Sequence, residues 1–205
     1  MKKSKLFAVL FTAALCATTF FTSCGNQNDT FEINATNVIG NTDRIATVRA
    51  KDHNGVLLGE AQFRNNGFTL FLTGSLSNSV LTSVSEAFPN KTISRRNARG
   101  TSIGYFIAFD NEGNEIGLVI LSGDRHQGFG DYLYSVSWLY VNRNVSIKGG
   151  SKQGDFYIET DYNLKTGWNI IYEDGSFNEP TGTRIFKFTT QKPSGMDFEW
   201  QFVEK

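Results

Sequence analysis

The stretch Phe156-Tyr-Ile-Glu-Thr-Asp-Tyr-Asn-Leu164 decides the fold class of this chain. Apolar, aromatic or β-branched residues stand at every second position, and Glu159, Asp161 and Asn163 stand between them. Successive side chains of an extended chain point to opposite faces. The alternation therefore predicts a β-strand with one buried face and one solvated face.

The same period of two recurs along the chain from residue 31 onward. It is clearest in the segments 103–109, 186–188 and 198–203. Between the predicted strands lie turn-forming pairs such as Asn54-Gly55 and Thr166-Gly167, which tolerate the positive φ angles of tight turns. Many short strands with regular turns predict an all-β protein, an antiparallel β-sandwich or barrel-like sheet of about ten strands.

One segment departs from this period. Apolar residues from Leu76 to Phe88 recur at spacings of three and four, which predicts a single short helix near 77–88 that ends before Pro89. The stretch 90–100, which follows, carries Lys91, Arg95, Arg96 and Arg99. This basic stretch is expected to be either an exposed loop or an edge strand protected by its charge.

Two stretches of sequence resemble each other at an offset of about sixty residues. The first runs from Ala50 through Asp52 and Gly55 to Gly59, and the second repeats its pattern from Ala108 to Gly117. Each copy reads as a strand, a turn that begins with Asp, and a returning strand. The repeat predicts two similar hairpins.

The N-terminal residues 1–23 have the features of a bacterial lipoprotein signal peptide. Lys2, Lys3 and Lys5 precede an apolar run from Leu6 to Phe21 that is too short for a permanent membrane span. Thr22 and Ser23 are small residues directly before Cys24, as lipoprotein signal peptidase requires. We expect cleavage before Cys24 and lipidation of its thiol, which would anchor the chain to a membrane. An ordinary secretory signal cut near Ser23 is the alternative.

The expected organisation is a signal peptide over 1–23, a short polar tether over 24–30 and a single β domain over 31–205. Lys and Arg total 20, as do Asp and Glu. Loss of three lysines with the signal leaves 17 basic and 20 acidic residues, a net charge of −3. Without a basic excess, nucleic acid is not an expected partner. A hydrophobic content of 40% argues against disorder.

Three stretches of the C-terminal half carry a family resemblance: Tyr140 to Gly149, Tyr162 to Tyr172, and Thr189 to Gly195 followed by Trp200. With these, the chain resembles a group of uncharacterised lipoproteins of Bacteroides and its relatives. The resemblance implies a β-rich lipoprotein of a Gram-negative cell envelope, attached to the outer membrane on either its periplasmic or its surface face. It implies no catalytic residue.

No set of residues predicts catalysis. His53 and His126 lie in polar turns, and the only cysteine left after signal cleavage is Cys24, which is consumed by lipid. Two carboxylate pairs, Glu159 with Asp161 and Glu173 with Asp174, are expected to be solvated or to point apart. We therefore expect no enzyme activity, no metal site and no cofactor.

Aromatic residues are the candidate ligand-binding set. Tyr134, Trp138 and Tyr140 share one face of the predicted strand 133–141, whose other face is also fairly apolar, and Trp200 lies in the last strand. Such rings either pack a core or stack against a sugar. A strand that is apolar on both faces is expected to be central in the sheet.

The leading hypothesis is a non-catalytic binding or accessory module of the outer membrane, for a glycan or peptide. Alternatives are a structural or fimbrial assembly subunit, marked by an incomplete sheet or exchangeable edge strand, and a lipocalin-like carrier. The carrier would need an apolar cavity inside a closed barrel.

Overall fold

The computed structural model describes residues 30–125, 132–178, 180 and 182–205. The predicted signal peptide, Cys24 and His126 lie outside the described residues. Of the described residues, 58% are in strands and 3% in helix, which confirms the predicted all-β class. Within this part of the chain, no helix is long and apolar enough to cross a bilayer.

The strands are β1 (Phe31–Ala35), β2 (Thr47–Lys51), β3 (Leu57–Gln62), β4 (Phe68–Leu72), β5 (Thr82–Ser83), β6 (Thr92–Ile93), β7 (Arg99–Ser102), β8 (Tyr105–Phe109), β9 (Glu115–Arg125), β10 (Tyr132–Val141), β11 (Val145–Gln153), β12 (Phe156–Leu164), β13 (Gly167–Asn178), β14 (Thr183–Thr189) and β15 (Glu199–Glu204), and the helix is α1 (Val84–Ala87). Three of the shortest strands, β5 to β7, lie in the region where the sequence predicted a helix and a loop or edge strand.

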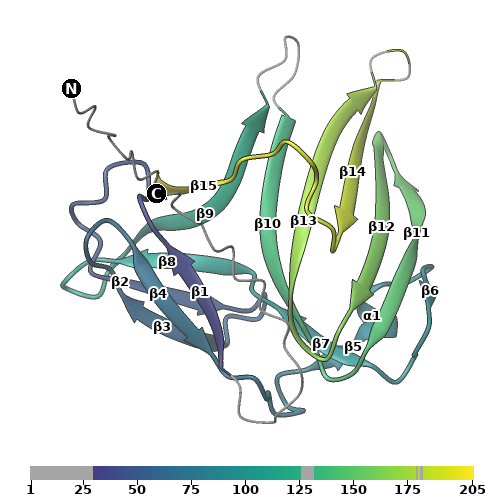
Figure 1. Ribbon diagram of the computed structural model, residues 1–205, viewed down its shortest axis with the longest axis horizontal. Helices are drawn as coiled ribbons and strands as arrows, with labels where there is room; N and C mark the ends of the chain where they lie inside the picture. Colours follow the sequence, from purple (N-terminus) through teal and green to yellow (C-terminus); the bar gives the residue numbers. More distant parts are fainter. Residues whose placement is uncertain (1–29, 126–131, 179, 181) are drawn as a thin grey trace, which may run out of the picture.

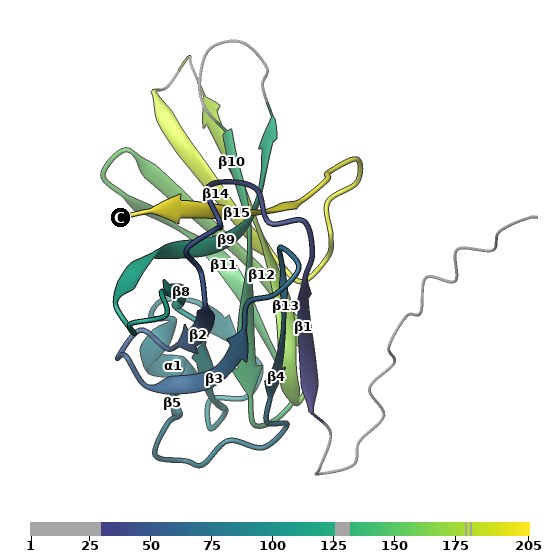
Figure 2. The same ribbon diagram turned by 90° about the vertical axis from the view of Figure 1, so that its left-hand side faces the viewer.

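Thirteen of the strands form one large sheet (Figure 1). Ten of them follow one another in the order β3-β2-β8-β9-β10-β13-β14-β12-β11-β6. Of the other three, β15 pairs with β9, β7 pairs with β10, and β5 pairs with β7. All its ladders are antiparallel except that between β12 and β14. The sheet is not closed into a barrel, so the barrel-like alternative is wrong. The remaining strands, β1 and β4, form a separate antiparallel pair that lies in the same half of the molecule as β2 and β3 (Figure 2).

Two hydrophobic cores lie on opposite faces of β10. The first core takes Val136, Trp138 and Tyr140 from β10 and packs them with residues of β1, β4, β8 and β15. The second core takes Leu139 and Val141 from β10 and packs them with residues of β11, β12 and β13. Alternate side chains of β10 thus enter different cores, which confirms the expectation of a central strand.

The short helix is confirmed, but α1 spans only Val84–Ala87 of the predicted 77–88. The apolar residues whose spacing suggested a longer helix are divided between the two cores. Leu76 and Leu81 pack in the first core, whereas Val84 and Phe88 pack in the second. Residues that enter two different cores cannot share one helix face, so the chain turns between them and pairs through β5 instead.

The two repeated stretches form matching hairpins, β2–β3 and β8–β9. In the first, Oδ1 of Asp52 accepts hydrogen bonds from the backbone N–H of Asn54 (2.9 Å) and Val56 (2.8 Å). In the second, Oδ1 of Asp110 accepts from the backbone N–H of Glu112 (3.0 Å) and Asn114 (2.8 Å). β2 and β8 pair directly with each other, so the two hairpins lie side by side in the sheet.

Candidate functional site

β10 changes partners along one of its edges. Near its start it pairs with β9, and this ladder ends at Ser135 opposite Ser122. Near its end it pairs with β7, and this ladder begins at Leu139 opposite Ser102. Between the two ladders, the backbone N–H of Ile103 donates to the carbonyl of Trp138 at 2.9 Å. The earlier part of β9 pairs instead with β8 and β15, so β9 diverges from β10 and leaves a gap.

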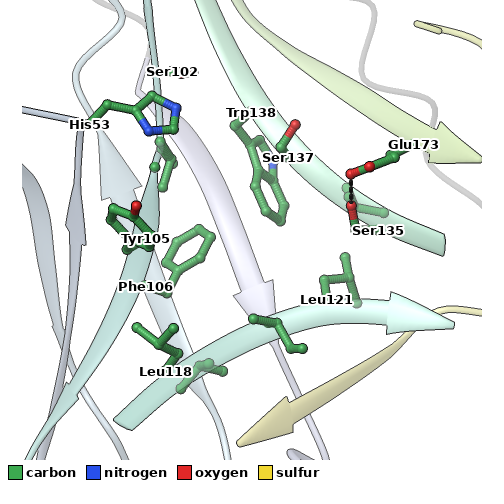
Figure 3. A pocket seen from close by; sticks show the side chains of 15 residues that line it. His53, Ser102, Tyr105, Phe106, Leu118, Leu121, Ser135, Ser137, Trp138 and Glu173 are labelled. Atoms are coloured by element: carbon green, nitrogen blue, oxygen red, sulfur yellow. Dashed lines mark hydrogen bonds between the residues drawn. The ribbon is translucent and has the colours of Figure 1, made fainter. Parts of the chain in front are cut away.

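A cavity of about 320 Å³ occupies this gap (Figure 3). Its walls come from residues 102–106 before and within β8, 118–121 of β9 and 135–138 of β10, together with His53 and Glu173. Because neighbouring residues of a strand point to opposite faces, a cavity lined by four consecutive residues of β10 reaches both faces of the sheet.

The apolar wall of the cavity is part of an aromatic cluster in the first core. The ring of Phe106 meets Trp138 edge-on, with centroids 5.2 Å apart, and Trp200 in the same manner at 5.6 Å. Trp138 and Trp200 are stacked, with their planes 9° apart. Rings held in edge-on and stacked contacts have little freedom to rotate, so this wall is preformed.

The polar side of the cavity is built around Glu173. Ser135 Oγ donates a hydrogen bond to Glu173 Oε2 at 2.6 Å, across the β10–β13 ladder in which these residues stand opposite each other. The carboxylate is half-buried. The pKa of Tyr162 is raised well above its ordinary value, chiefly by burial and further by the negative charge of Glu173. Glu173 therefore acts electrostatically on the interior of the sheet as well as on the cavity.

His53 lies on the opposite side of the cavity from Glu173 (Figure 3). It comes from the β2–β3 turn, is exposed as the sequence predicted, and meets the ring of Tyr105 edge-on at 6.0 Å. It packs directly on Gly104, where an added Cβ would stand 3.0 Å from His53 Nδ1. The cavity thus offers an imidazole at one side and a carboxylate at the other.

All four aromatic candidates predicted from the sequence are buried. Tyr134, Trp138, Tyr140 and Trp200 are between 4% and 7% exposed. Their place in the interior agrees with the core-packing alternative that the sequence left open. Trp138 alone of the four lines the cavity, and ligand binding by this set remains a prediction.

The two predicted carboxylate pairs lie as expected, the first solvated on one strand face and the second pointing apart. Glu159 and Asp161 are both exposed on the outer face of β12, where Asp161 pairs with Lys148 at 2.9 Å. Glu173 stands opposite Ser135, whereas Asp174 stands opposite Tyr134, so their side chains leave opposite faces of β13. Within the described ranges, no group of three His, Cys, Asp or Glu side chains is placed to share a metal ion.

Sequence reasoning missed Phe106, Ser135, Ser137 and the part played by Glu173 in the cavity. Only the alternation in 103–109 gave a signal, since it placed Phe106 on a strand. Nothing in the sequence shows that β9 pairs with β10 only from Ser122 onward, because that depends on pairing between distant segments.

The sequence matches no protein-family model, and neither curated proteins nor solved structures give a significant match to it.

Proposed function

We propose that the protein is a lipid-anchored, non-catalytic binding module of a Gram-negative outer membrane and that it holds a small ligand in the cavity between β9 and β10. The N-terminal sequence up to Cys24 and the resemblance to Bacteroides lipoproteins support the anchor. The observation that carries the binding role is the cavity itself, with a preformed aromatic wall and a carboxylate held by a serine. Binding sites are commonly apolar hollows with a few placed polar groups.

The ligand that best fits this lining is a protonated amine carried on a compact apolar group. Glu173 is the acidic side chain of the lining, which contains no lysine or arginine. The ammonium group of such a ligand would donate a charge-assisted hydrogen bond to the Glu173 carboxylate. The apolar part of the ligand would lie on Phe106 and Trp138. A peptide amino terminus beside an apolar side chain has this chemistry, which agrees with the peptide-binding hypothesis. A volume of about 320 Å³ suits one such group rather than a long chain.

Binding of 2-phenylethylamine tests this proposal, because its ring and amine match the two sides of the cavity. Trp138 lies in the cavity wall, so saturable quenching of tryptophan fluorescence reports occupancy. We expect 3-phenylpropionate, which has an anion in place of the amine, to bind at least tenfold more weakly. Glu173→Gln should weaken amine binding about tenfold or more, since hydrogen bonds to charged groups contribute about 1.5–3 kcal/mol.

Glu159→Gln is the matched control, because Glu159 is exposed on the outer face of β12. It should leave amine binding unchanged. Equal binding of the two probes, or an unchanged affinity in Glu173→Gln, contradicts the amine assignment. Saturable binding of a neutral sugar in place of the amine would favour the glycan alternative.

Assembly is a second candidate, and one observation favours it. β1 pairs with β4 along one edge, and among the described residues no strand pairs with its other edge. An N-terminal edge strand is the mark expected of an exchangeable subunit. Asn34 and Thr69 stand opposite each other in this ladder. In the double variant Asn34→Cys with Thr69→Cys, a disulfide between the two new cysteines would lock β1 in place. Oligomers that form equally well in the locked protein contradict assembly by strand exchange.

A further inference from the structure

One end of the molecule carries a cluster of positive charge. Its five residues, here called the basic end, are Arg95, Arg96, Arg99, Arg143 and Lys165. They come from three connections that are far apart in the sequence: the segment between β6 and β7 together with the start of β7, the β10–β11 turn and the β12–β13 turn.

Hydrogen bonds join these three connections into one surface. The backbone N–H of Arg99 donates to Asn142 Oδ1 at 3.0 Å, and the N–H of Asn142 returns a bond to the carbonyl of Arg99 at 2.9 Å. The backbone N–H of Thr166 donates to Asn144 Oδ1 at 2.8 Å. Arg143 therefore stands between a loop that carries Arg99 and a loop that carries Lys165.

The charges of the basic end are not neutralised within the molecule. Among the described residues, none of the five forms an ion pair, whereas Arg44, Arg49, Lys148 and Lys205 elsewhere all do. Arg95, Arg96 and Lys165 are exposed, and so is Arg99, although its guanidinium also donates to the carbonyl of Leu81. The acidic residue nearest in the chain to Arg95 is Glu86 of α1, and the one nearest to Lys165 is Asp161, whose carboxylate is already paired with Lys148 at 2.9 Å. A local excess of positive charge thus stands on a mature chain whose expected net charge is −3.

β1, the first strand of the domain, begins at this same end. The ring of Phe31, at the start of β1, lies 6.5 Å from that of Trp168, which follows the Lys165–Thr166 turn. Trp168 Nε1 in turn donates to the carbonyl of Thr73, just after β4, at 3.0 Å. Figures 1 and 2 agree that β1 begins at the end of the molecule where β5 also lies, and Figure 1 shows β7 at that end.

We propose that the basic end docks on the anionic lipid surface of the membrane that holds the anchor, and so fixes the orientation of the domain. This inference rests on the proposed lipidation of Cys24. Residues 24–30, fully extended, span at most about 25 Å, so the basic end stays near the headgroups. Unpaired basic residues at that distance are attracted to anionic lipids, and the attraction is screened by salt over about 8–10 Å. The turn between β11 and β12, at the opposite end, then points away from the bilayer (Figure 1).

Two labelled proteins test the orientation. Lipidated protein purified from envelopes, with Cys16 cleaved away, receives a fluorophore at Asn97→Cys in the basic end or at Asp155→Cys in the β11–β12 turn. Each is reconstituted into vesicles of phosphatidylcholine alone or with added phosphatidylglycerol, both containing a quencher lipid. We expect the label at 97 to be quenched several-fold more than the label at 155 in anionic vesicles. High salt should remove the difference. Circular dichroism checks that both labelled proteins are folded.

Charge reversal supplies the matched control. Arg95→Glu with Arg96→Glu should abolish the preference in anionic vesicles, whereas Lys152→Glu with Lys187→Glu, exposed on β11 and β14, should preserve it. Protein that floats with neutral vesicles but shows equal quenching of both labels in anionic vesicles overturns the docking while the anchor stands. Protein that fails to float even with neutral vesicles overturns the lipid anchor and the docking with it.

Discussion

Trp200 ties the last strand of the chain to the first core. It is 7% exposed, stacks on Trp138 and meets Phe68 edge-on at 5.3 Å. Its carbonyl also accepts the backbone N–H of Ile39 at 2.8 Å, so side chain and backbone hold the strand from two directions. A residue in this position contributes to stability by packing rather than by presenting a platform to solvent.

We predict that Trp200→Ala destabilises the protein by about 3–5 kcal/mol, the cost of truncating a buried aromatic residue. For a domain of this size, that lowers Tm by roughly 10 °C. Thermal unfolding followed by circular dichroism measures the change. Val203→Ala in the same strand is the control, because Val203 is 49% exposed and its truncation should move Tm little. A Tm that is equally insensitive to both changes contradicts the core assignment.

Cys24 carries the prediction on which the membrane anchor depends. Small residues at 22 and 23 and the basic residues before the apolar run predict that this thiol is lipidated. Cells grown with a labelled fatty acid should incorporate label into the wild-type protein and not into Cys24→Ala. Label of equal intensity in the two proteins rules out Cys24 as the lipidated residue.

Glu173 shows which features of the site could be predicted from the sequence. Its neighbour Asp174 was correctly expected on the other face, because that follows from alternation alone. Its contact with Ser135 and its place in the cavity depend on the register between β10 and β13, which are separated by two further strands in the chain. A strand pattern fixes the face of each residue but not the strand that pairs with it.

At the scale of elements, the two repeated hairpins are an internal comparison. Asp52 is 2% exposed, whereas Asp110 is only half-buried. Each carboxylate nevertheless accepts hydrogen bonds from the backbone N–H groups two and four residues further along the chain. Asp52→Ala removes a buried carboxylate and leaves two backbone N–H donors without their partner, which should cost about 1–3 kcal/mol. Asp110→Ala should cost less, because water can replace the lost carboxylate. Urea unfolding of both variants makes the comparison, and a larger loss in Asp110→Ala contradicts it.

Asp110 also predicts a pH dependence. The backbone N–H of Asn114 is the main cause of a lowered pKa for this carboxyl, and the side chain of Asn114 adds to it. A group whose pKa is lower in the folded protein stabilises it at pH values above the unfolded pKa, and the contribution disappears as pH falls through the folded value. The Tm difference between wild type and Asp110→Asn should therefore be largest near neutral pH and vanish in strong acid. A difference that persists unchanged at pH 2 contradicts this account.

The segment 77–100 shows where element prediction was least accurate. The spacing of Leu81, Val84 and Phe88 is compatible with a helix, but these residues fill two cores, and only Val84 of the three lies in the single turn of α1. Lys91 then fastens the segment to the sheet, donating from Nζ to the carbonyls of Gly149 (2.9 Å) and Ile158 (3.2 Å). Apolar residues at helical spacing predict a helix only where all of their side chains enter the same core.

At the scale of the whole molecule, β15 joins the C-terminal segment to β9 and contributes Trp200 and Phe202 to the first core. β15 pairs with β9 from Glu199 opposite Ser122 to Glu204 opposite Gly117, and Phe202 donates its N–H to the carbonyl of Ile39 at 2.7 Å. The alternation in 198–203 predicted an integral strand, and the structure places one there. β15 thus pairs with residues 118–121 of β9, the stretch of that strand that lines the cavity.

We therefore predict that deletion of residues 197–205 abolishes folding rather than shortening a tail. The deletion removes Trp200 and Phe202 from the first core and leaves one edge of β9 unpaired beside the cavity. Their combined loss approaches or exceeds the total stability of about 5–15 kcal/mol that a domain commonly has. The truncated protein should lack a cooperative thermal transition, while deletion of Lys205 alone, whose ammonium pairs with Glu115 on the surface, should keep one. A cooperative transition in the truncated protein would show that the sheet holds the first core without its last strand.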